Sequence, residues 1–518
     1  MPMKYCPYKL NLDGASRILG RSLCIAENKR KMNILSYRGP GKAGGVSGAL
    51  ARIVDGTSDR LIRWWYLNEN GLASKTGRED LQHVKAIPRN IVEGHYRHCN
   101  NFLWPVLHDM PERAIYSPGD RQSYRLFNQL FALNILQAKD KSDHNYFFVQ
   151  DYQLALQPPS LAYGINSVVN TFWHIPWPHF VERAHLKPLV EIAEALLDSN
   201  KLGFHIDEYA LNFMNFVRLH LPQYEVDFDT RQIVPIKTKL LNSDRLVFSQ
   251  VVVCPLGLDW DFWRQNANLE ETVGLGSTII EACSKPYILS VDRADYSKGI
   301  LQRIAAIDHL FEEKPSLIGK ITFVQVCQPS RIGLIQFDRY WRQLQKALHD
   351  LNSRWRKPGW QPLVWEAEPV APADLAWLYK NATAMLVSPI RDGLNLTAKE
   401  FVACSNKDDG LLLLSAGAGV WQEIGDMAIT IDAHAPIVAA QQIARSLSIA
   451  KPERIRRMAG LKARIKANPL EVWWRNFTSC NTQIGITSTI ASVRQKFGLE
   501  GTSLSDGEEM KVPTIFKE

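Results

Sequence analysis

Short apolar runs separated by helix-like segments constrain the fold of this chain more than any other feature. The runs are almost continuously hydrophobic, which is typical of strands buried on both faces of a sheet. Between them, segments such as 187–200 and 303–314 place apolar residues at helical spacing. Repeated strand–helix–strand units predict an α/β fold with parallel sheets and right-handed crossovers. The predicted strands include residues 32–37, 145–151, 169–176, 251–257, 287–292, 321–326, 384–389, 411–415 and 428–431.

These runs are too many for one ordinary doubly wound sheet, so we expect two α/β domains. The chain has 518 residues, enough for two or three domains of ordinary size. A polar, loop-like stretch near residues 256–280 is the expected break between them. Residues 452–467 and 471–477 have the pattern of helices, and the final 18 residues form a polar tail.

Composition and charge are compatible with an anionic small molecule or with a polyanion. The 61 basic and 53 acidic residues give a net charge of +8, spread along the chain, and no nucleic-acid-binding motif appears. The eight cysteines include no C-x-x-C pair, which favours a reducing compartment over zinc or redox sites. Residues 1–30 lack a continuous apolar stretch, and no run is long enough to span a bilayer. We therefore expect a cytoplasmic protein with no membrane partner.

Cationic residues follow three consecutive strands of the second predicted domain. Arg293 and Lys298 follow the strand in "YILSVDRADYSKGI", Arg331 follows the next, and "IRDGLNLTAKE" follows residues 384–389. Taken singly, such charges are most often surface ion pairs. Because ligands bind beyond the carboxyl ends of strands in open α/β sheets, three such loops together predict a phosphate or pyrophosphate site. Asp392 and Glu400 would suit sugar or ribose hydroxyls.

Polar residues also follow strands of the first predicted domain. Gly44 and Gly45 precede a helix-like segment, an arrangement that suits a phosphate but also an ordinary tight turn. Asp151 and His174 end two successive strands. Each alone is better explained as a helix cap or a packed side chain, whereas the two together favour a shared cleft. No metal-binding cluster is evident, so we expect arginine and lysine to neutralise a bound diphosphate and no cofactor to be required.

The motifs resemble the trehalose-6-phosphate synthase family of retaining glycosyltransferases, glycosyltransferase family 20, which includes the glucosylglycerol-phosphate synthases. The resemblance rests on "LWPVLH", "QDYQL", "HIPWP", "SVDRADYSKG", "CQPSR" and "SPIRDGLNLTAKEFVA", which occur in family order between about residues 32 and 480. It implies a GT-B fold, with two Rossmann-like doubly wound domains and the active site in the cleft between them. The expected division is an N-terminal extension (1–31), an acceptor-side domain (32–260), a nucleotide-sugar domain (261–468), a C-terminal helix returning to the first domain (469–498) and the tail (499–518).

The resemblance also implies roles for individual residues. Arg293 and Lys298 would hold the donor diphosphate, and His174 would lie beside the glucose, which makes these three the expected catalytic residues. Asp392 would contact the donor sugar, Glu400 the ribose, and Val370 would lie beside the nucleobase. The other expected donor-binding residues are Gly44, Gly45, Asn395, Leu396, Thr397, Ala398 and Lys399, and the expected acceptor-binding residues are Arg38, His95, Trp104, Asp151 and Arg331.

Departures from the family pattern cluster on the acceptor side. The usual "HDYHL" reads "QDYQL", so that Gln150 and Gln153 replace two histidines, and His95 stands at the position of a common tyrosine. "GKAGG" and "DYSKG" are similar to trehalose-6-phosphate synthases, whereas "WPVLHDMP" and "GFHIDEYALNF" are more similar to glucosylglycerol-phosphate synthases. We therefore predict glucose transfer from ADP- or UDP-glucose to glycerol 3-phosphate, for compatible-solute synthesis, with glucose 6-phosphate as the alternative acceptor. A phosphatase would act downstream, and a homo-oligomer is compatible with the sequence.

Two alternatives of other kinds stay open. The altered "QDYQL" is compatible with a catalytically silent homologue that binds sugar phosphates and regulates a partner. A pseudo-glycosyltransferase that joins cyclitols shares "DYQL" and "HIPWP". An assay with nucleotide sugars and several acceptors separates these readings from glucosyl transfer.

Overall fold

The computed structural model describes most of the chain, in the ranges 31–40, 45–56, 62–67, 81–84, 87–138, 145–162, 167–236, 248–269 and 274–478. Four predictions therefore lie outside the described residues: Gly44, nearly all of the extension (1–31), most of the C-terminal helix (469–498) and the polar tail. None of the helices in these ranges is long and apolar enough to cross a membrane.

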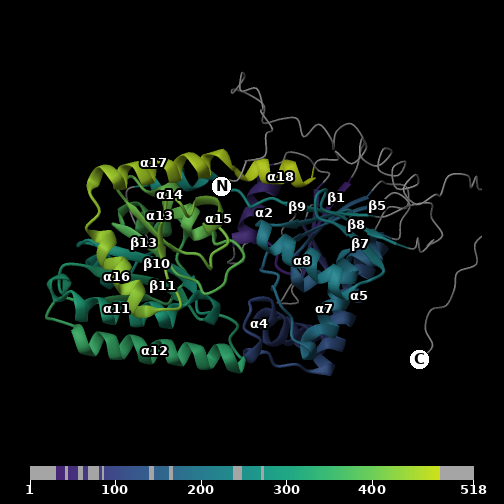
Figure 1. Ribbon diagram of the computed structural model, residues 1–518, viewed down its shortest axis with the longest axis horizontal. Helices are drawn as coiled ribbons and strands as arrows, with labels where there is room; N and C mark the ends of the chain where they lie inside the picture. Colours follow the sequence, from purple (N-terminus) through teal and green to yellow (C-terminus); the bar gives the residue numbers. More distant parts are fainter. Residues whose placement is uncertain are drawn as a thin grey trace, which may run out of the picture.

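Two sheets organise the described chain into two domains that lie side by side (Figure 1). The first sheet has nine strands in the order β3-β2-β1-β4-β5-β6-β9-β8-β7. Its strands are β1 (Lys31–Leu35), β2 (Ile62–Leu67), β3 (Leu81–Val84), β4 (Asn145–Gln150), β5 (Ser167–Trp173), β6 (Lys201–Phe204), β7 (Tyr224–Asp227), β8 (Gln232–Pro235) and β9 (Ser249–Val253).

The first sheet is parallel, as predicted, except at one edge, where an antiparallel hairpin was not predicted. The strands from β3 to β9 pair in parallel, but β8 pairs antiparallel with both β7 and β9. The hairpin β7–β8 is short and mostly half-exposed, with sequences YEVD and QIVP. Such strands lack the continuous apolar run on which the prediction was based.

The second sheet has six parallel strands in the order β12-β11-β10-β13-β14-β15. Its strands are β10 (Tyr287–Arg293), β11 (Thr322–Gln328), β12 (Leu363–Glu366), β13 (Ala384–Val387), β14 (Leu411–Ser415) and β15 (Ile429–Ile431). Both sheets therefore contain the 3-2-1-4-5-6 strand order of the doubly wound fold. In that order the chain reverses direction beside the first strand, which puts one crevice between β1 and β4 and the other between β10 and β13.

Helices cover both sheets (Figure 1). The first domain carries α2 (Gly45–Gly56), α3 (Arg89–Arg97), a π-helical turn (His98–Leu103), α4 (Trp104–Leu107), α5 (Pro118–Gln137), α6 (Pro158–Ala162), α7 (Arg183–Leu196) and α8 (Asp207–His220). The second carries α9 (Trp260–Ala267), α10 (Ser277–Ala282), α11 (Ile300–Glu313), α12 (Ile335–Trp355), α13 (Pro372–Asn381), α14 (Leu396–Cys404), α15 (Trp421–Ile424), α16 (Pro436–Leu447) and α17 (Lys451–Ala467).

The chain crosses between the domains twice, at adjacent points. Leu258 pairs with the segment at Asn468 and Pro469, accepting from Leu470 N–H at 3.1 Å. After this crossing α17 gives way to α18 (Leu470–Thr478), which lies over the first domain (Figure 1). There Phe477 packs on Phe172, with ring centroids 5.0 Å apart. The last described helix thus completes the core of the first domain, although it follows the second in sequence.

Candidate active site

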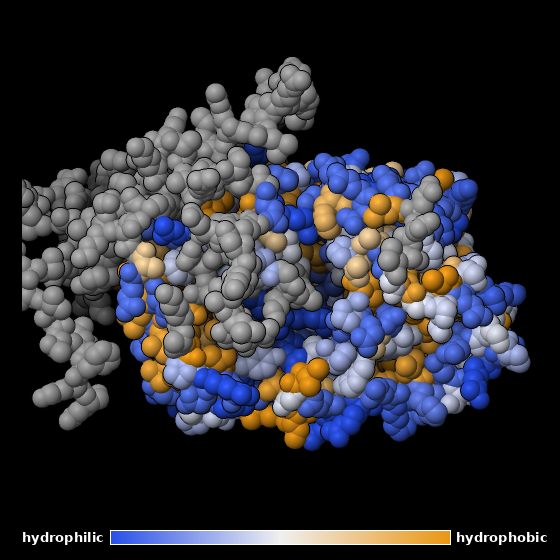
Figure 2. Space-filling model, turned by 180° about the vertical axis from the view of Figure 1, so that it is seen from behind, coloured by the Kyte–Doolittle hydropathy of each residue, from blue (hydrophilic) through white to orange (hydrophobic). Residues whose placement is uncertain are grey.

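The carboxyl ends of β1, β4 and β5 in the first domain and of β10, β11 and β13 in the second carry the predicted site residues. The surface is hollowed near the middle of the molecule, and hydrophilic residues line the hollow (Figure 2). Two contacts show that the two sets of loops meet. A Cβ atom on Gly45, at the start of α2, would lie 2.7 Å from Leu396 Cδ1 at the start of α14. Tyr209 on α8 donates a hydrogen bond from its hydroxyl to the carbonyl of Asp392 at 2.8 Å.

Arg331 is held by partners from both domains. Its Nη1 lies 2.6 Å from Asp295 Oδ2, its Nε donates to Asn100 Oδ1 at 2.5 Å, and its guanidinium carbon lies 4.1 Å from the ring centre of Trp104. Asn100 belongs to the π-helical turn between α3 and α4, a local distortion that often marks a functional site. These contacts fix the orientation of the guanidinium before any ligand binds.

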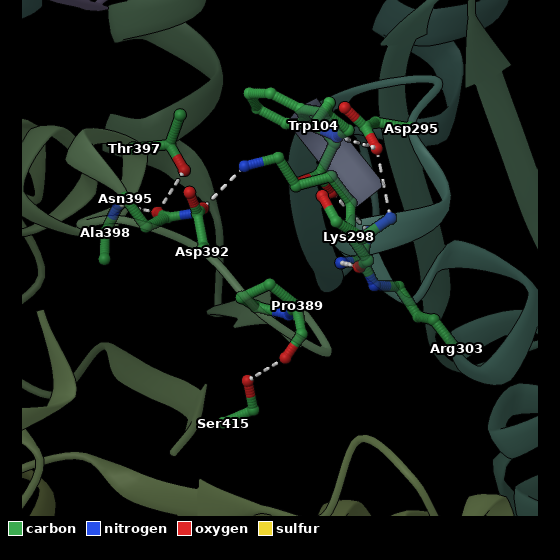
Figure 3. A network of polar contacts seen from close by, with 12 residues as sticks. Trp104, Asp295, Lys298, Arg303, Pro389, Asp392, Asn395, Thr397, Ala398 and Ser415 are labelled. Carbon is green, nitrogen blue, oxygen red and sulfur yellow. Dashed lines mark hydrogen bonds and ion pairs between the residues drawn. The ribbon is translucent and has the colours of Figure 1, made fainter. Parts of the chain in front are cut away.

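Asp295 is the acidic centre of this cluster. It also accepts a hydrogen bond from Trp104 Nε1 at 3.3 Å, as Figure 3 shows. Burial alone would raise the pKa of this carboxyl, but Arg331, Arg293 and Lys298 surround it and lower the pKa below its usual range. Asp295 therefore carries a full negative charge under all ordinary conditions.

Arg293 is the least satisfied cation of the cluster. It lies at the end of β10, is partly buried, and has no hydrogen bond or ion pair to any described residue. Burial lowers its pKa, and the neighbouring Arg331 and Arg38 lower it further. Arg293 and Arg331 lie beside the single carboxylate of Asp295, and Arg38 lies beside Arg293, so the cluster has a local excess of positive charge. Such an excess suits an anionic ligand with several oxygens.

Lys298 and Asp392 form the second charged pair of the cleft (Figure 3). Lys298 Nζ lies 2.6 Å from Asp392 Oδ2, and the two side chains are only 12% and 13% exposed. Asn395 donates to the same carboxylate oxygen at 3.1 Å. Burial would raise the pKa of Asp392, but Lys298 and Asn395 lower it.

Asn395 also starts α14. Its backbone has a φ of 79°, and its Oδ1 accepts from Ala398 N–H at 3.2 Å and from Thr397 Oγ1 at 2.8 Å (Figure 3). The side chain thus caps one of the orphan N–H groups of the helix, while the N-terminal turn stays beside the cleft. The positive end of the helix dipole adds to the excess of positive charge there.

Glu400 and Lys399 are both buried on α14 but have different partners. Glu400 is buried and accepts a hydrogen bond from Tyr379 at 3.0 Å, and its burial raises the pKa of the carboxyl to about 7. The ammonium of Lys399 is fully buried, lies 2.5 Å from Glu423 Oε2 and donates to Leu256 O at 3.0 Å. The side chain of Lys399 therefore ties α14 to the interdomain crossing, and only its backbone remains for the predicted donor contact. Val370 follows β12 and packs half-buried against the core.

A chain of hydrogen bonds fixes the tautomers of two buried histidines. The backbone N–H of Leu256 donates to His205 Nδ1 at 3.3 Å, so His205 carries its proton on Nε2. His205 Nε2 lies 3.2 Å from His174 Nδ1, which places the proton of His174 on Nε2, where it reaches Gln150 Oε1 at 2.8 Å. Burial lowers the pKa of His174 to about 3. His174 is thus neutral with both ring nitrogens engaged, and in this arrangement it cannot take up a proton.

Asp151 lies beside these two hydrogen-bonded histidines and has a strained backbone conformation, with a φ of 66°. Its Oδ1 accepts from the backbone N–H of His174 at 3.1 Å, and burial raises the pKa of the carboxyl to about 7. Backbone strain of this kind in a non-glycine residue is typical of functional sites.

The structure places His95 in the core. Its ring is fully buried, stacks on Phe127 with ring centroids 3.8 Å apart, and bonds to the carbonyl of Gln153 at 2.9 Å. Its burial lowers the pKa of the imidazole to about 4. The ring fills the aromatic cluster beneath the acceptor side and does not line the cleft as the resemblance implied.

Several residues of the site were not among the predicted ones. Asp295 lies between Arg293 and Lys298 in the quoted motif. Its position between two cations could have identified it as a residue of the site. Asn100 gave no local signal, whereas His205 and Tyr209 lie in the quoted motif "GFHIDEYALNF" but act through partners distant in sequence. His108 stacks on Trp104 at 3.9 Å, and burial lowers its pKa to about 4. Among the described residues no group of three or more histidine, cysteine or acidic side chains could hold a metal ion.

Two doubly wound domains that face each other across this cationic cleft define the GT-B fold. The family model described as "Glycosyltransferase family 20" matches residues 30–482. The chain belongs to that family.

Relatives carry two different names. A bifunctional trehalose-6-phosphate synthase/phosphatase of Thermoproteus tenax is 31% identical over 391 residues, which cover 74% of this chain and 51% of that protein, so the chain spans about half of its length. A glucosylglycerol-phosphate synthase of Synechocystis is 29% identical over 391 residues, 72% of this chain and 76% of that protein. The structure of an alpha,alpha-trehalose-phosphate synthase from Burkholderia xenovorans in complex with glucose-6-phosphate matches with a TM-score of 0.77 and 25% identity, over 86% and 98% of the two chains.

Proposed function

We propose that the protein transfers glucose, with retention of configuration, from a nucleoside-diphosphate glucose to a small phosphorylated acceptor. The observation that carries the proposal is the excess of positive charge in the cleft. Arg293 and Arg331 lie beside one carboxylate, Asp295, and Arg38 adds a third guanidinium beside Arg293. Lys298 and the start of α14 lie nearby. A donor diphosphate and an acceptor phosphate would together supply the missing negative charge.

The leaving diphosphate would gather charge as the bond to glucose breaks. Arg293 ends β10 and Lys298 lies in the turn that follows, and both would stabilise that charge, a contribution of about 3 kcal/mol for a single preorganised group. Asp392 and Glu400 would bind hydroxyls of the donor sugar and ribose, with Val370 beside the base and Gly45 beside the phosphates. Because both ring nitrogens of His174 are engaged within the protein, an oxygen of the departing phosphate is the better candidate to take the proton of the acceptor hydroxyl.

Arg331 would hold the acceptor phosphate, with Trp104, Arg38 and Asp151 completing the acceptor site. For the acceptor itself we propose glycerol 3-phosphate, supported by the motifs "WPVLHDMP" and "GFHIDEYALNF" and by the name of the Synechocystis relative. Glucose 6-phosphate has equal support from relatives named trehalose-6-phosphate synthase. In either case the product would retain the phosphate of the acceptor, and a phosphatase would remove it.

A direct assay tests this function. The protein is incubated with ADP- or UDP-glucose and with glycerol 3-phosphate, glucose 6-phosphate or a cyclitol phosphate, and release of the nucleoside diphosphate is measured. We expect acceptor-dependent release with glycerol 3-phosphate. Release with only glucose 6-phosphate would show that this sugar phosphate is the acceptor, and the proposed glucosyl transfer would still hold. If no acceptor promotes release while sugar phosphates still bind, a silent regulatory homologue is the better account.

A further inference from the structure

Three consecutive residues of the second domain, Arg391 to Gly393, contact the first domain. Arg391 extends its guanidinium between two carboxylates of the first domain. Its Nη2 lies 2.5 Å from Glu208 Oε1, and its Nε lies 3.1 Å from Asp109 Oδ2. The Arg391 side chain is 17% exposed, while the two acidic side chains are about two-fifths exposed, at 41% and 40%.

The next two residues make backbone contacts across the same junction. The carbonyl of Asp392 accepts the hydroxyl proton of Tyr209 at 2.8 Å, and the ring of Tyr209 lies 5.0 Å from the guanidinium carbon of Arg391. At Gly393 a Cβ atom would overlap the carbonyl oxygen of His174, so the two backbones touch. Asp109, Glu208, Tyr209 and Arg391 are hereafter called the clamp.

The clamp contacts the backbone of Asp392, whereas the carboxylate of Asp392 is bound by residues of the second domain. That carboxylate pairs with Lys298 at 2.6 Å and accepts from Asn395 at 3.1 Å. The backbone of Asp392 is held by both domains. Within the second domain its N–H donates to Gly417 O at 2.8 Å and its carbonyl accepts from Gly419 N–H at 3.1 Å, and Tyr209 adds the bond from the first domain. A shift of the first domain away from Arg391 would remove the Tyr209 bond and leave Asp392 held from one side only.

The clamp residues of the first domain come from two motifs in which they have no role in the proposed chemistry. Asp109 ends "WPVLHD", and Glu208 and Tyr209 lie in "GFHIDEYALNF", at the start of α8. Asp109 has a φ of 57°, a strained conformation for a non-glycine residue that directs it toward the junction. Burial and the neighbouring Glu208 raise the pKa of Asp109, and Arg391 offsets part of that rise.

We propose that Asp109, Glu208 and Tyr209 are positioning residues that close the first domain on Arg391 and thereby fix Asp392 for the donor sugar. This inference rests on the proposed function for the role of Asp392, but the closure itself does not. Closure would exclude water from the cleft, so that the donor is transferred and not hydrolysed.

Hydrogen exchange tests the closure without any assay of activity. The double variant Asp109→Asn/Glu208→Gln keeps the shape of both side chains and removes both ion pairs with Arg391. In the full-length protein we expect amide exchange in the segment 391–398 to accelerate about tenfold, and the radius of gyration in solution scattering to increase. The matched control is Asp207→Asn, which removes an ion pair of 2.7 Å with Arg231 inside the first domain, one residue away from Glu208. The control should leave exchange in 391–398 unchanged.

Steady-state kinetics test the positioning role. We expect Tyr209→Phe, which keeps the ring and loses the bond to Asp392, to raise the ratio of donor hydrolysis to transfer about tenfold, because a misplaced site loses transfer more than binding. Arg391→Lys, which keeps the charge, should recover part of the activity lost in Arg391→Ala. Wild-type exchange in 391–398 in the double variant, or a wild-type hydrolysis ratio in Tyr209→Phe, would overturn the proposal. If no acceptor supports transfer at all, exchange and scattering still decide whether the clamp closes the domains.

Discussion

Arg331 and Asp295 form an ion pair of 2.6 Å whose side chains are 6% and 0% exposed. The pair joins the ends of β11 and β10, and Trp104 of the first domain covers it. Pairs buried to this degree are strongly coupled to folding, because removing one partner leaves an uncompensated charge in the interior.

Asp295→Asn should therefore destabilise the protein strongly. We expect a loss of about 3 kcal/mol in the free energy of unfolding, because Arg331 would be left buried without its counter-charge. Urea titration followed by fluorescence measures this loss. The matched control is Asp308→Asn, which breaks a half-exposed pair with Arg354 and should cost less than about 1 kcal/mol. Equal losses in the two variants would show that the Asp295 pair contributes no more than a surface pair.

Arg293→Ala should separate activity from stability. The side chain of Arg293 has no hydrogen bond or ion pair to any described residue, and the attraction of Asp295 is opposed by burial and by the like charges of Arg331 and Arg38. Its removal should therefore leave the melting temperature nearly unchanged. The rate of transfer should fall about 10²–10³-fold, since one group that stabilises the leaving diphosphate is lost. Arg339→Ala, which removes an exposed arginine of α12, is the control and should retain full activity. Near-normal turnover of Arg293→Ala would contradict the donor assignment.

Arg331→Lys should affect the acceptor more than the donor. The substitution keeps a cation beside Asp295 but loses the planar fork that can hold a phosphate and Asn100 together. We expect the KM for the phosphorylated acceptor to rise about tenfold and the KM for the nucleotide sugar to change less than twofold. Initial rates over a matrix of both substrates give the two constants. A rise in only the KM for the nucleotide sugar would show that Arg331 binds the donor and not the acceptor.

Asp151 should make stability depend on pH. Folding raises the pKa of this carboxyl to about 7, so between about pH 4 and pH 7 the folded protein holds a proton that the unfolded chain has released. The contribution of Asp151 to stability is therefore complete below pH 4 and is lost as the pH rises to 7. Asp151→Asn should flatten this fall, so that the variant gains stability relative to wild type at pH 8. Parallel unfolding profiles of the two proteins from pH 4 to 8 would contradict the assignment.

The two buried histidines should keep their tautomers across the working pH range. Burial lowers the pKa of His174 to about 3 and that of His205 well below its ordinary value, and Leu256 N–H fixes the acceptor nitrogen of His205. In ¹⁵N-labelled protein, both rings should give the shifts of neutral Nε2–H tautomers from pH 5.5 to 8.5. A proton on Nδ1 of His174, or titration of either ring in this range, would show that the hydrogen-bond chain is wrong.

The positions of strands could be predicted from the sequence where the strands are buried on both faces. The runs at 145–151, 287–292 and 411–415 correspond to β4, β10 and β14, whose sequences are almost continuously apolar. The strands β2, β3, β6 and β12 were missed, although all four pair in parallel within a sheet. β3, β6 and β12 have only four residues each, and β2 (IRWWYL) carries an arginine, so none of the four stands out as a long apolar run.

The site was accessible where its residues follow strands and not where they act through distant partners. Arg293, Lys298 and Arg331 could be grouped because parallel strands end at one edge of a sheet. The burial of His95 could not be predicted, because it depends on Phe127 and Gln153, more than 20 positions away. The inward orientation of Lys399 likewise depends on Glu423 and Leu256, which are also more than 20 positions away. The clamp on Arg391 likewise joins Asp109 and Glu208, which lie far from it along the chain.

The most direct test of the central claim is the structure of the product formed from nucleoside-diphosphate glucose and glycerol 3-phosphate, determined by proton NMR during the reaction. The account predicts one glucosyl product that keeps its phosphate and has the same α configuration at the anomeric carbon as the donor. A β-linked product, or free glucose as the only product with every phosphorylated acceptor tested, would contradict it.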